Sequence, residues 1–544
     1  MLPARLIVML LGITLATSFQ YGYHSAVINQ PLHVGVWWTS LQKVKFIADF
    51  IGNISESRYG VSNESYKTTV ASICVTSFIV GGLVGALSSG TISNKLGRKK
   101  SILFLTIPCL LGTVLIMLCN LTRSFETIII GRFLIGCSCG AYTAVAPIYL
   151  SEVTPVSLRG MGGVLNQVMI VISVVVSQIL GLPSIMNTDV LWPYLLGINV
   201  VPCVVGAICL FFCPESPRYL YLAKKDITSA ASALKSLRNN PEDVVKELDE
   251  LAKELDVTSG KVSQITEPHN FRKAGVLDIL RVPHLRLALL IALAAHCGQQ
   301  LSGMNGLLFY SVELFKSNGL SAAAANYATT GIGCVLLGVT IISIFVIDRV
   351  GRRVLLIWGL CVVLTCLLIF TLCMIIKEAA HMSWLVNVAM ASIYVFVCGF
   401  GVGAGSIPWF LVVEMFSQEY RDTATAIGVA VNWTCIIIIG LGFIQLINYF
   451  GVYAFLPSAC IEAIVILVLY KYMPETMGRT SMSIEAELKR KVAVNRASHN
   501  ESQVQDMPLK QHEEADEPMG SLKGSLFLSF ANHLLASWMA ILLK

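Results

Sequence analysis

The chain has 544 residues, of which 55% are hydrophobic and 13% are charged, and its formal net charge at pH 7 is +6. A soluble domain carries about 25% charged residues, so this composition excludes a soluble protein and requires burial of apolar surface in lipid. The modest positive charge lies in short loops and follows membrane topology, so it does not indicate nucleic-acid binding.

Apolar segments of about 20 residues, the length that spans a bilayer, follow one another along the chain. We expect each of them to be helical, because lipid offers no water to satisfy the backbone. The predicted helices cover residues 6–30, 67–91, 101–121, 126–150, 160–183, 190–213, 284–312, 322–347, 353–377, 384–414, 422–448 and 450–473. The predicted fold is an all-α multi-pass membrane protein with two pseudo-symmetric six-helix bundles.

Three landmarks of the first half recur in the same order in the second half. They are Gly97-Arg98 with Gly351-Arg352, Glu152 and Arg159 with Glu414 and Arg421, and Pro214-Glu215-Ser216 with Pro474-Glu475-Thr476. The offset stays between roughly 254 and 262 residues, which indicates an internal duplication. In membrane carriers two such halves enclose the binding site. The predicted domains are 1–213, a cytosolic helical linker 214–283, a second bundle 284–473 and a tail 474–544.

Basic residues alternate between the loops and predict that both termini lie in the cytosol. The loops around 184–191 and 449 lack Lys and Arg and fall on the opposite side. The long first loop is then extracellular, and its sequons at Asn53 and Asn63 are predicted glycosylation sites. The polar tail from about 485 to 523 is predicted to be disordered. For the apolar end, residues 524–544, a thirteenth spanning helix and an interfacial helix both remain open.

Charged residues concentrate at the predicted cytosolic ends of the helices and recur in both halves. Ion pairs between the ends of two bundles hold while the bundles are close and are lost when they separate. This pattern predicts a cytosolic gate, with simple anchoring of the helix ends as the alternative. The predicted gate residues are Arg98, Glu152, Arg159, Glu215, Arg218, Asp348, Arg352, Glu414 and Arg421.

The helix interiors hold neutral amides and few charges. The amides are Gln20, Asn29, Gln167, Gln178, Gln299, Gln300, Asn305 and Asn432. An amide is costly in lipid and therefore faces a cavity or another helix, and it offers the donors and acceptors that sugar hydroxyls need. For any single glutamine, a helix–helix contact is the alternative. Segments 299–306 and 403–409, with their glycines and Pro408, are predicted places for the helices to break.

These features resemble the sugar porter family of the major facilitator superfamily, and most closely the animal facilitative glucose transporters. The resemblance covers roughly residues 6–490. It is carried by Tyr-Gly-Tyr at 21–23, Val-Ile-Asn-Gln-Pro at 27–31, Gly-Arg-Phe at 131–133, Pro-Glu-Ser-Pro-Arg at 214–218, Gln-Gln-Leu-Ser-Gly at 299–303, Ile-Pro-Trp-Phe at 407–410 and Pro-Glu-Thr at 474–476. It implies twelve helices, a hexose substrate and alternating access.

The resemblance also implies roles for particular side chains. The implied sugar contacts are Gln167, Gln299, Gln300, Asn305, Trp409 and Asn432, and the nine charged residues named above fall in the cytosolic gate. In this respect the chain resembles the glucose-preferring members, which carry a tryptophan at the position of Trp409. Leu336, Gly401 and Ile436 stand where these transporters usually carry Asn, Glu and Asn. Each change removes a hydrogen-bonding group worth about 1–3 kcal/mol, so the exact sugar stays open.

Proton-driven relatives carry an Asp in the first helix where this chain has His24. Without that carboxylate we favour a uniporter, and His24 is the alternative proton site because histidine titrates near pH 6.5. His296 is predicted to pack at a helix interface.

The sequence thus predicts facilitative transport of a hexose, D-glucose first, by a plasma-membrane protein whose partners are a small neutral sugar and the bilayer. A proton-coupled symporter of a sugar or polyol and a non-transporting sugar sensor are the alternatives. We find no catalytic triad, metal-ligand spacing or phosphate-binding loop in a plausible place, so we expect no enzyme, no cofactor and no metal. The sequence leaves the oligomeric state and the tissue or organelle open.

Overall fold

The computed structural model describes most of the chain. The described residues are 3–28, 46–60, 63–155, 158–182, 184–186, 188–260, 275–304, 307, 315, 316, 319, 321–380, 382 and 384–505. The chain divides into one compact unit over Met1–Val492 and a second over Ala493–Lys544. Both helix bundles belong to the first unit. The predicted domain boundaries within it stay predictions, and the apolar end at 524–544 lies outside the described residues.

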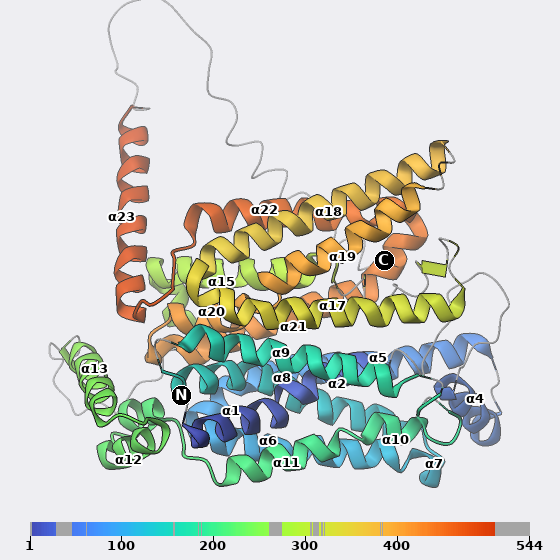
Figure 1. The fold of residues 1–544 in the computed structure, drawn as a ribbon, viewed down its shortest axis with the longest axis horizontal. Helices are drawn as coiled ribbons and strands as arrows, with labels where there is room; N and C mark the ends of the chain where they lie inside the picture. The colour runs from blue at the N-terminus through green and yellow to red at the C-terminus, as the bar shows by residue number, and fades with distance from the viewer. Residues whose placement is uncertain are drawn as a thin grey trace, which may run out of the picture. The chain divides into compact units, whose positions relative to one another are not determined.

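The first bundle occupies the lower half of Figure 1. Its helices are α1 (Ala4–Ala16), α2 (Ser18–Ala26), α5 (Glu64–Leu96), α6 (Arg98–Met117), α8 (Glu126–Val153), α9 (Arg159–Leu180), α10 (Trp192–Gly197) and α11 (Val200–Phe211), with the short α7 (Cys119–Thr122). The predicted first helix is interrupted at Thr17, whose hydroxyl donates to the Ile13 carbonyl at 2.6 Å. A hydroxyl that competes for the backbone in this way commonly bends a helix.

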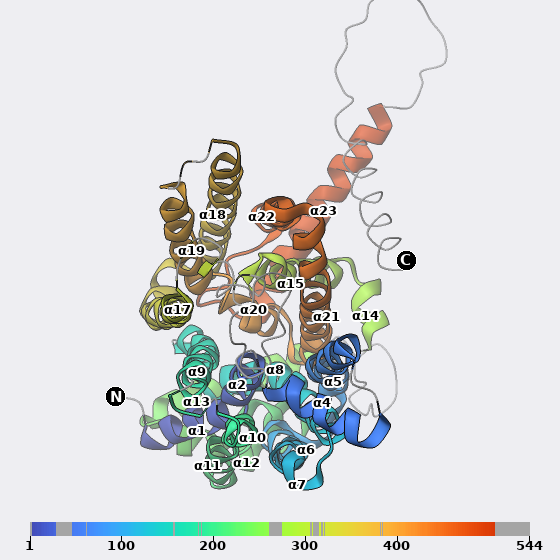
Figure 2. The same ribbon diagram turned by 90° about the vertical axis from the view of Figure 1, so that its right-hand side faces the viewer.

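The second bundle repeats this plan in the upper half of Figure 1. Its helices are α15 (Pro283–Leu301), α17 (Ala322–Val350), α18 (Arg352–Ala380), α19 (Leu385–Val402), α20 (Ile407–Met415), α21 (Gln418–Phe450) and α22 (Leu456–Tyr472), the last preceded by the 3-10 turn η3 (Gly451–Phe455). Figures 1 and 2 show α9 beside α17 and α5 beside α21, so these pairs join the bundles. The predicted all-helical, two-bundle fold is confirmed.

Eleven described helical stretches are long and apolar enough to cross a membrane. The predicted seventh span, 284–312, begins as α15 but is interrupted at Ser302 and Gly303, where Gly303 adopts a φ of +90°. Only a glycine adopts this conformation without strain. The predicted break in the tenth span is also present, because α19 ends at Val402 and α20 begins at Ile407 with Pro408 in its first turn. Residues 308–314 lie outside the described part.

Several elements lie outside the two bundles. The linker, predicted to be helical, forms the π-helical turn η2 (Tyr219–Ala223), α12 (Ile227–Leu237), α13 (Pro241–Gly260) and α14 (Val276–Arg281). In Figure 1, α12 and α13 lie at one end of the first bundle and α4 (Phe46–Tyr59) lies at the other. The helix α4 was not predicted. The two sequon asparagines, Asn53 on α4 and Asn63 before α5, are exposed.

The prediction of disorder from residue 485 onward was wrong for its first part. Residues Ser481–Gln505 form the helix α23. Ile484 and Leu488 on this helix are buried at 0% and 1% exposure in the core of the second bundle. The predominantly polar composition hid these two apolar anchors, which lie one helical turn apart.

Close packing of the first bundle depends on glycines between α5 and α8. A Cβ atom on Gly85 would overlap the Cys137 carbonyl, and one on Gly140 would overlap the Gly82 carbonyl. Small residues let membrane helices approach this closely, and the gain is van der Waals contact.

We expect Gly140→Val to lower the thermal stability of the purified protein in detergent. The added side chain has to push α5 from α8, and overpacking of this kind costs about 1–3 kcal/mol or more. Gly338→Val on α17 is the matched control, since nothing lies within 4 Å of a Cβ placed there. Equal unfolding temperatures for the two variants would contradict this account of the α5–α8 contact.

Candidate functional site

Four buried charged side chains meet where the two bundles join at the ends that the sequence predicts to be cytosolic. At the start of α6, Arg98 donates to both carboxylate oxygens of Glu152 on α8, at 2.9 and 3.0 Å, and to Asp422 on α21, at 3.0 Å. Arg421 on α21 approaches the same Glu152 carboxylate at 3.5 Å. Arg98 and Glu152 belong to the first bundle and Arg421 and Asp422 to the second. We name these four residues the cross-bundle charge cluster.

The corresponding residues of the second bundle pair mainly with one another. Arg352 on α18 lies 3.0 Å from Asp348 on α17 and 3.3 Å from Glu414 on α20. Asp348 also accepts a hydrogen bond from the backbone N–H of Met161 on α9, at 3.2 Å, which reaches the first bundle. A side chain on Gly160 would collide with Asp348 and Arg352, so the glycine allows this approach.

The repeated Pro-Glu motifs cap the helices that carry these arginines. Glu215 accepts the backbone N–H groups of Arg98 and Lys99 at 2.9 and 3.0 Å. Glu475 accepts those of Arg352 and Arg353 at 2.9 and 3.0 Å. A carboxylate at a helix N-terminus satisfies free N–H groups and complements the helix dipole. The two glutamates therefore fix the positions of Arg98 and Arg352.

Two predicted gate residues are not part of either ion-paired set. Arg218 pairs with Glu254 of the linker helix α13. Arg159, at the start of α9, makes no ion pair within 4 Å with a described residue, although it interacts electrostatically with Glu414 and Arg218. The remaining seven predicted residues take part in the pairs and caps described above.

Sequence reasoning missed Asp422. The signal was present in the duplication, because Arg159 is followed by Gly160 whereas the equivalent Arg421 is followed by Asp422. The structure shows what this difference in sequence does. Asp422 is 3% exposed and supplies Arg98 with an acid from the opposite bundle.

A second polar group lies in the interior of the second bundle and consists of Gln299 and Gln300 on α15 and Asn432 on α21. The Asn432 amide donates to Gln299 Oε1 at 2.8 Å and accepts from Gln300 Nε2 at 2.9 Å. Gln299 in turn donates to the carbonyls of Ala404 and Gly405 at the break between α19 and α20. We name Gln299, Gln300 and Asn432 the amide cluster. His296, predicted to pack at an interface, also contacts it, with Nδ1 3.1 Å from Asn432 Nδ2.

Aromatic side chains connect the amide cluster to the first bundle. The Trp409 ring lies edge-on to His296, with centroids 5.5 Å apart, and to Tyr21 of α2, at 6.2 Å. The buried indole nitrogen of Trp409 has no hydrogen-bond partner among the described residues. Gln167 of α9 is also buried, and its Nε2 lies 3.4 Å from where a Cβ on Gly405 would be. The predicted sugar residue Asn305 lies outside the described residues.

Leu336 and Gly401, two of the three positions where this chain lacks the polar residue usual in the family, lie next to each other. A Cβ on Gly401 would lie 3.2 Å from Leu336 Cδ1, so the leucine fills the space beside a residue that has no side chain. Ile436 is partly buried and packs against the first bundle's core. The nearest described polar group is the Thr340 hydroxyl, 3.5 Å from the Cβ position of Gly401, and it already donates to the Leu336 carbonyl.

The alternative proton site, His24, is fully buried near the end of α2. Neither of its ring nitrogens has a hydrogen-bond partner among the described residues. Arg132 of α8 donates to its backbone carbonyl at 3.0 Å. A fixed cation beside a histidine is an unfavourable place for a second positive charge.

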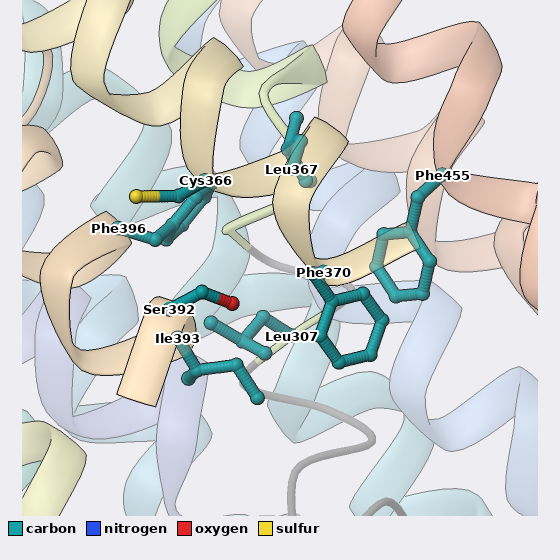
Figure 3. A pocket seen from close by; sticks show the side chains of 9 residues that line it. Leu307, Cys366, Leu367, Phe370, Ser392, Ile393, Phe396 and Phe455 are labelled. Atoms are coloured by element: carbon teal, nitrogen blue, oxygen red, sulfur yellow. The ribbon is translucent and has the colours of Figure 1, made fainter. Parts of the chain in front are cut away.

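A pocket within the second bundle adjoins the break in α15. Figure 3 shows its wall of Leu307, Phe370, Phe396 and Phe455, with Ser392 as the only labelled side chain that carries oxygen. The Ser392 hydroxyl already donates to the Ala389 carbonyl. Among the described residues, this lining therefore offers a sugar few hydrogen-bonding groups.

Comparisons with known proteins agree on one family. The family model described as "Sugar (and other) transporter" matches residues 10–488. The facilitated glucose transporters of solute carrier family 2, member 3 and member 1 from Gallus gallus, are each 36% identical to this chain; 88% of the chain is covered in both comparisons, with 91% and 92% of the respective relative. Among solved structures, the proton:xylose symporter XylE bound to 6-bromo-6-deoxy-D-glucose superposes with a TM-score of 0.72 at 22% identity, covering 89% of this chain and 99% of that one.

Proposed function

This chain belongs to the sugar transporter family, and we propose that it carries a hexose, D-glucose first, down its concentration gradient by alternating access. Relatives described as facilitated glucose transporters cover nearly all of the region that holds both bundles. The chain is a multi-pass membrane protein and not an enzyme.

The observation that carries the proposal is the amide cluster, together with the aromatic contacts that join it to the first bundle. Its three amides satisfy one another, so a sugar that offers hydroxyl donors and acceptors can exchange for these bonds at small net cost. Trp409, with its unpaired indole N–H, provides an apolar face and one further donor to such a ligand. Gln167 reaches the same region from the first bundle.

The cross-bundle charge cluster serves as the gate on the cytosolic side. Its pairs join the bundles while they are in contact and are lost when they separate to release sugar. The buried charges are then hydrated, which offsets much of the lost pairing energy. A gate of this kind therefore holds one side closed without blocking the cycle.

We place the protein in the plasma membrane with both termini in the cytosol. The basic loops support this orientation, and so does the position of α4, which carries the Asn53 sequon at the end opposite the linker helices.

The orientation gives an expected outcome for glycosylation. Asn53 and Asn63 are exposed and should both carry glycans when the protein is made in animal cells. Treatment with an N-glycosidase should increase the mobility of the wild type on a gel, and this shift should be smaller in the double variant Asn53→Gln, Asn63→Gln. Modification at Asn500 of the tail instead would contradict the orientation.

A proton-coupled sugar carrier is the second candidate. A buried carboxyl group in α22, Glu462, favours it, because an ionisable group inside a membrane-spanning helix is a candidate proton carrier. The first candidate requires no pH gradient for exchange of sugar, whereas the second predicts that a gradient drives accumulation.

The decisive test is countertransport with the purified full chain in liposomes. Vesicles loaded with unlabelled D-glucose should take up labelled D-glucose without any pH or voltage gradient, and loading with D-fructose, D-xylose or myo-inositol ranks the substrates. Accumulation only under an inward proton gradient would favour the second candidate. Absence of exchange with every one of these solutes would contradict both.

A further inference from the structure

Glu462 is a carboxyl group buried at the middle of a membrane-spanning helix. It lies on α22 near the midpoint of the span Tyr453–Tyr472 and is 0% exposed. Neither of its carboxylate oxygens has a hydrogen-bond partner among the described residues, and none of the described basic side chains forms an ion pair with it. The gate carboxylates Glu152 and Glu414, by contrast, each pair with an arginine.

The described groups around Glu462 offer no compensating charge. The elements packed against α22 are α15, α18 and η3. From α15, Gly298 faces the carboxylate, with a Cβ position 3.7 Å from Oε2. From α18, the thiol of Cys361 is a titratable group that interacts with it.

Several other titratable and charged groups on these elements are engaged elsewhere or reach solvent. On α15, His284 pairs with Glu485, Arg286 is exposed, and His296 and Cys297 contact Asn432 and Cys435 of α21. On α18, Arg352 pairs with Asp348 and Glu414, and Arg353 donates to the Tyr470 carbonyl two turns further along α22. Tyr453 of η3 is 49% exposed. An isolated ionised carboxylate is very costly in such a site, so Glu462 carries a proton in this conformation.

The position of Glu462 links it to the amide cluster. Gly298, which faces its carboxyl group, directly precedes Gln299 and Gln300. One turn earlier on the same face of α22, Ser458 Oγ lies 3.9 Å from a Cβ position on Gly303, where α15 is interrupted. Ser458, Glu462 and Val465 therefore form the surface on which the interrupted helix rests. Any movement of α15 around a bound sugar changes the surroundings of Glu462.

We propose that Glu462 is a proton-binding site whose occupancy is linked to the position of α15, so that sugar transport by this chain depends on pH. This inference rests on the proposed function, and it adds a proton as a second ligand of the same machinery. The protonated carboxyl group stabilises the packed conformation described above. When α15 moves and water reaches the carboxyl group, the proton leaves to that water, and the carboxylate must be reprotonated before the helix packs again.

The test is equilibrium exchange of labelled D-glucose in proteoliposomes with equal pH on both sides, from about pH 5 to about pH 9. Wild-type exchange should fall toward alkaline pH, by up to about tenfold per pH unit for one linked proton. Glu462→Gln resembles the protonated side chain and should keep the rate of the acidic wild type at every pH. Cys361→Ala and His24→Gln are controls that should retain the wild-type pH profile.

A second measurement does not require transport. The infrared carbonyl band of a protonated carboxylic acid should persist in the wild type at neutral pH and be absent from Glu462→Gln and from the apolar variant Glu462→Leu. Absence of such a difference would overturn the proposal, as would an unchanged pH profile in Glu462→Gln or a flat profile in the wild type. A wild type that exchanges no sugar at any pH but retains the band would contradict the proposed function while supporting the proton site.

Discussion

Replacing Glu152 by glutamine is expected to open the cytosolic gate and to slow sugar exchange at least tenfold. Glu152 is 8% exposed and is shared by Arg98 and Arg421 from different bundles, and it also accepts the Ser216 hydroxyl at 2.6 Å. Without its charge, two buried arginines face the single carboxylate of Asp422. Removal of one partner of a buried ion pair costs roughly 3–5 kcal/mol, and each 1.36 kcal/mol changes a population about tenfold.

The equivalent substitution in the second half is expected to have a smaller effect on exchange, although the sequence repeat is symmetric. In Glu414→Gln, Arg352 keeps Asp348 of its own bundle at 3.0 Å, so the effect on exchange should be smaller. Asp422→Asn removes only the acid that Arg98 receives from the second bundle, and its effect should also be smaller than that of Glu152→Gln. The measurement compares the exchange rates and the unfolding temperatures of the three variants under the same conditions. Equal effects of Glu152→Gln and Glu414→Gln would contradict this assignment of the gate.

Asn432→Leu is expected to weaken sugar binding by one to two orders of magnitude. The asparagine bonds to Gln299, Gln300 and His296, so its removal leaves three buried polar groups without a common partner. Each unsatisfied group costs about 1–3 kcal/mol, and a site built to bind hydroxyls discriminates strongly once such a group is lost. The concentration of D-glucose that half-saturates countertransport should rise accordingly.

The first bundle offers a matched control for this substitution. Asn199 donates to Gln20 at 2.7 Å, which makes a buried amide pair away from the amide cluster. Asn199→Leu should lower the stability of the protein and leave half-saturation unchanged. A similar rise in half-saturation for both variants would mean that Asn432 acts through stability alone.

Much of the architecture follows from local properties of the sequence. Apolar runs of spanning length and the positions of Gly303 and Pro408 determine where the helices lie and break, because backbone hydrogen bonding in lipid is decided within each segment. The duplicated Gly-Arg and Glu-Arg motifs likewise identify most of the charges that meet at one end of the bundles. The polar character of Gln299, Gln300 and Asn432 within apolar helices predicts that they need partners.

Tertiary structure alone decided which partners those are. Arg98 and Asp422 are 324 positions apart in the sequence, and their ion pair exists only because two bundles place both side chains in the same buried junction. Glu462 differs from the gate glutamates for the same reason. The carboxyl groups are chemically identical, but Glu152 is paired with Arg98 whereas Glu462 has no partner among the described residues. It also explains α23, where two apolar residues in a polar segment find the second bundle's core. Sequence specifies the groups and the helices that carry them, but the energy of a buried charge depends on what lies within a few ångströms of it, and only the folded chain determines that.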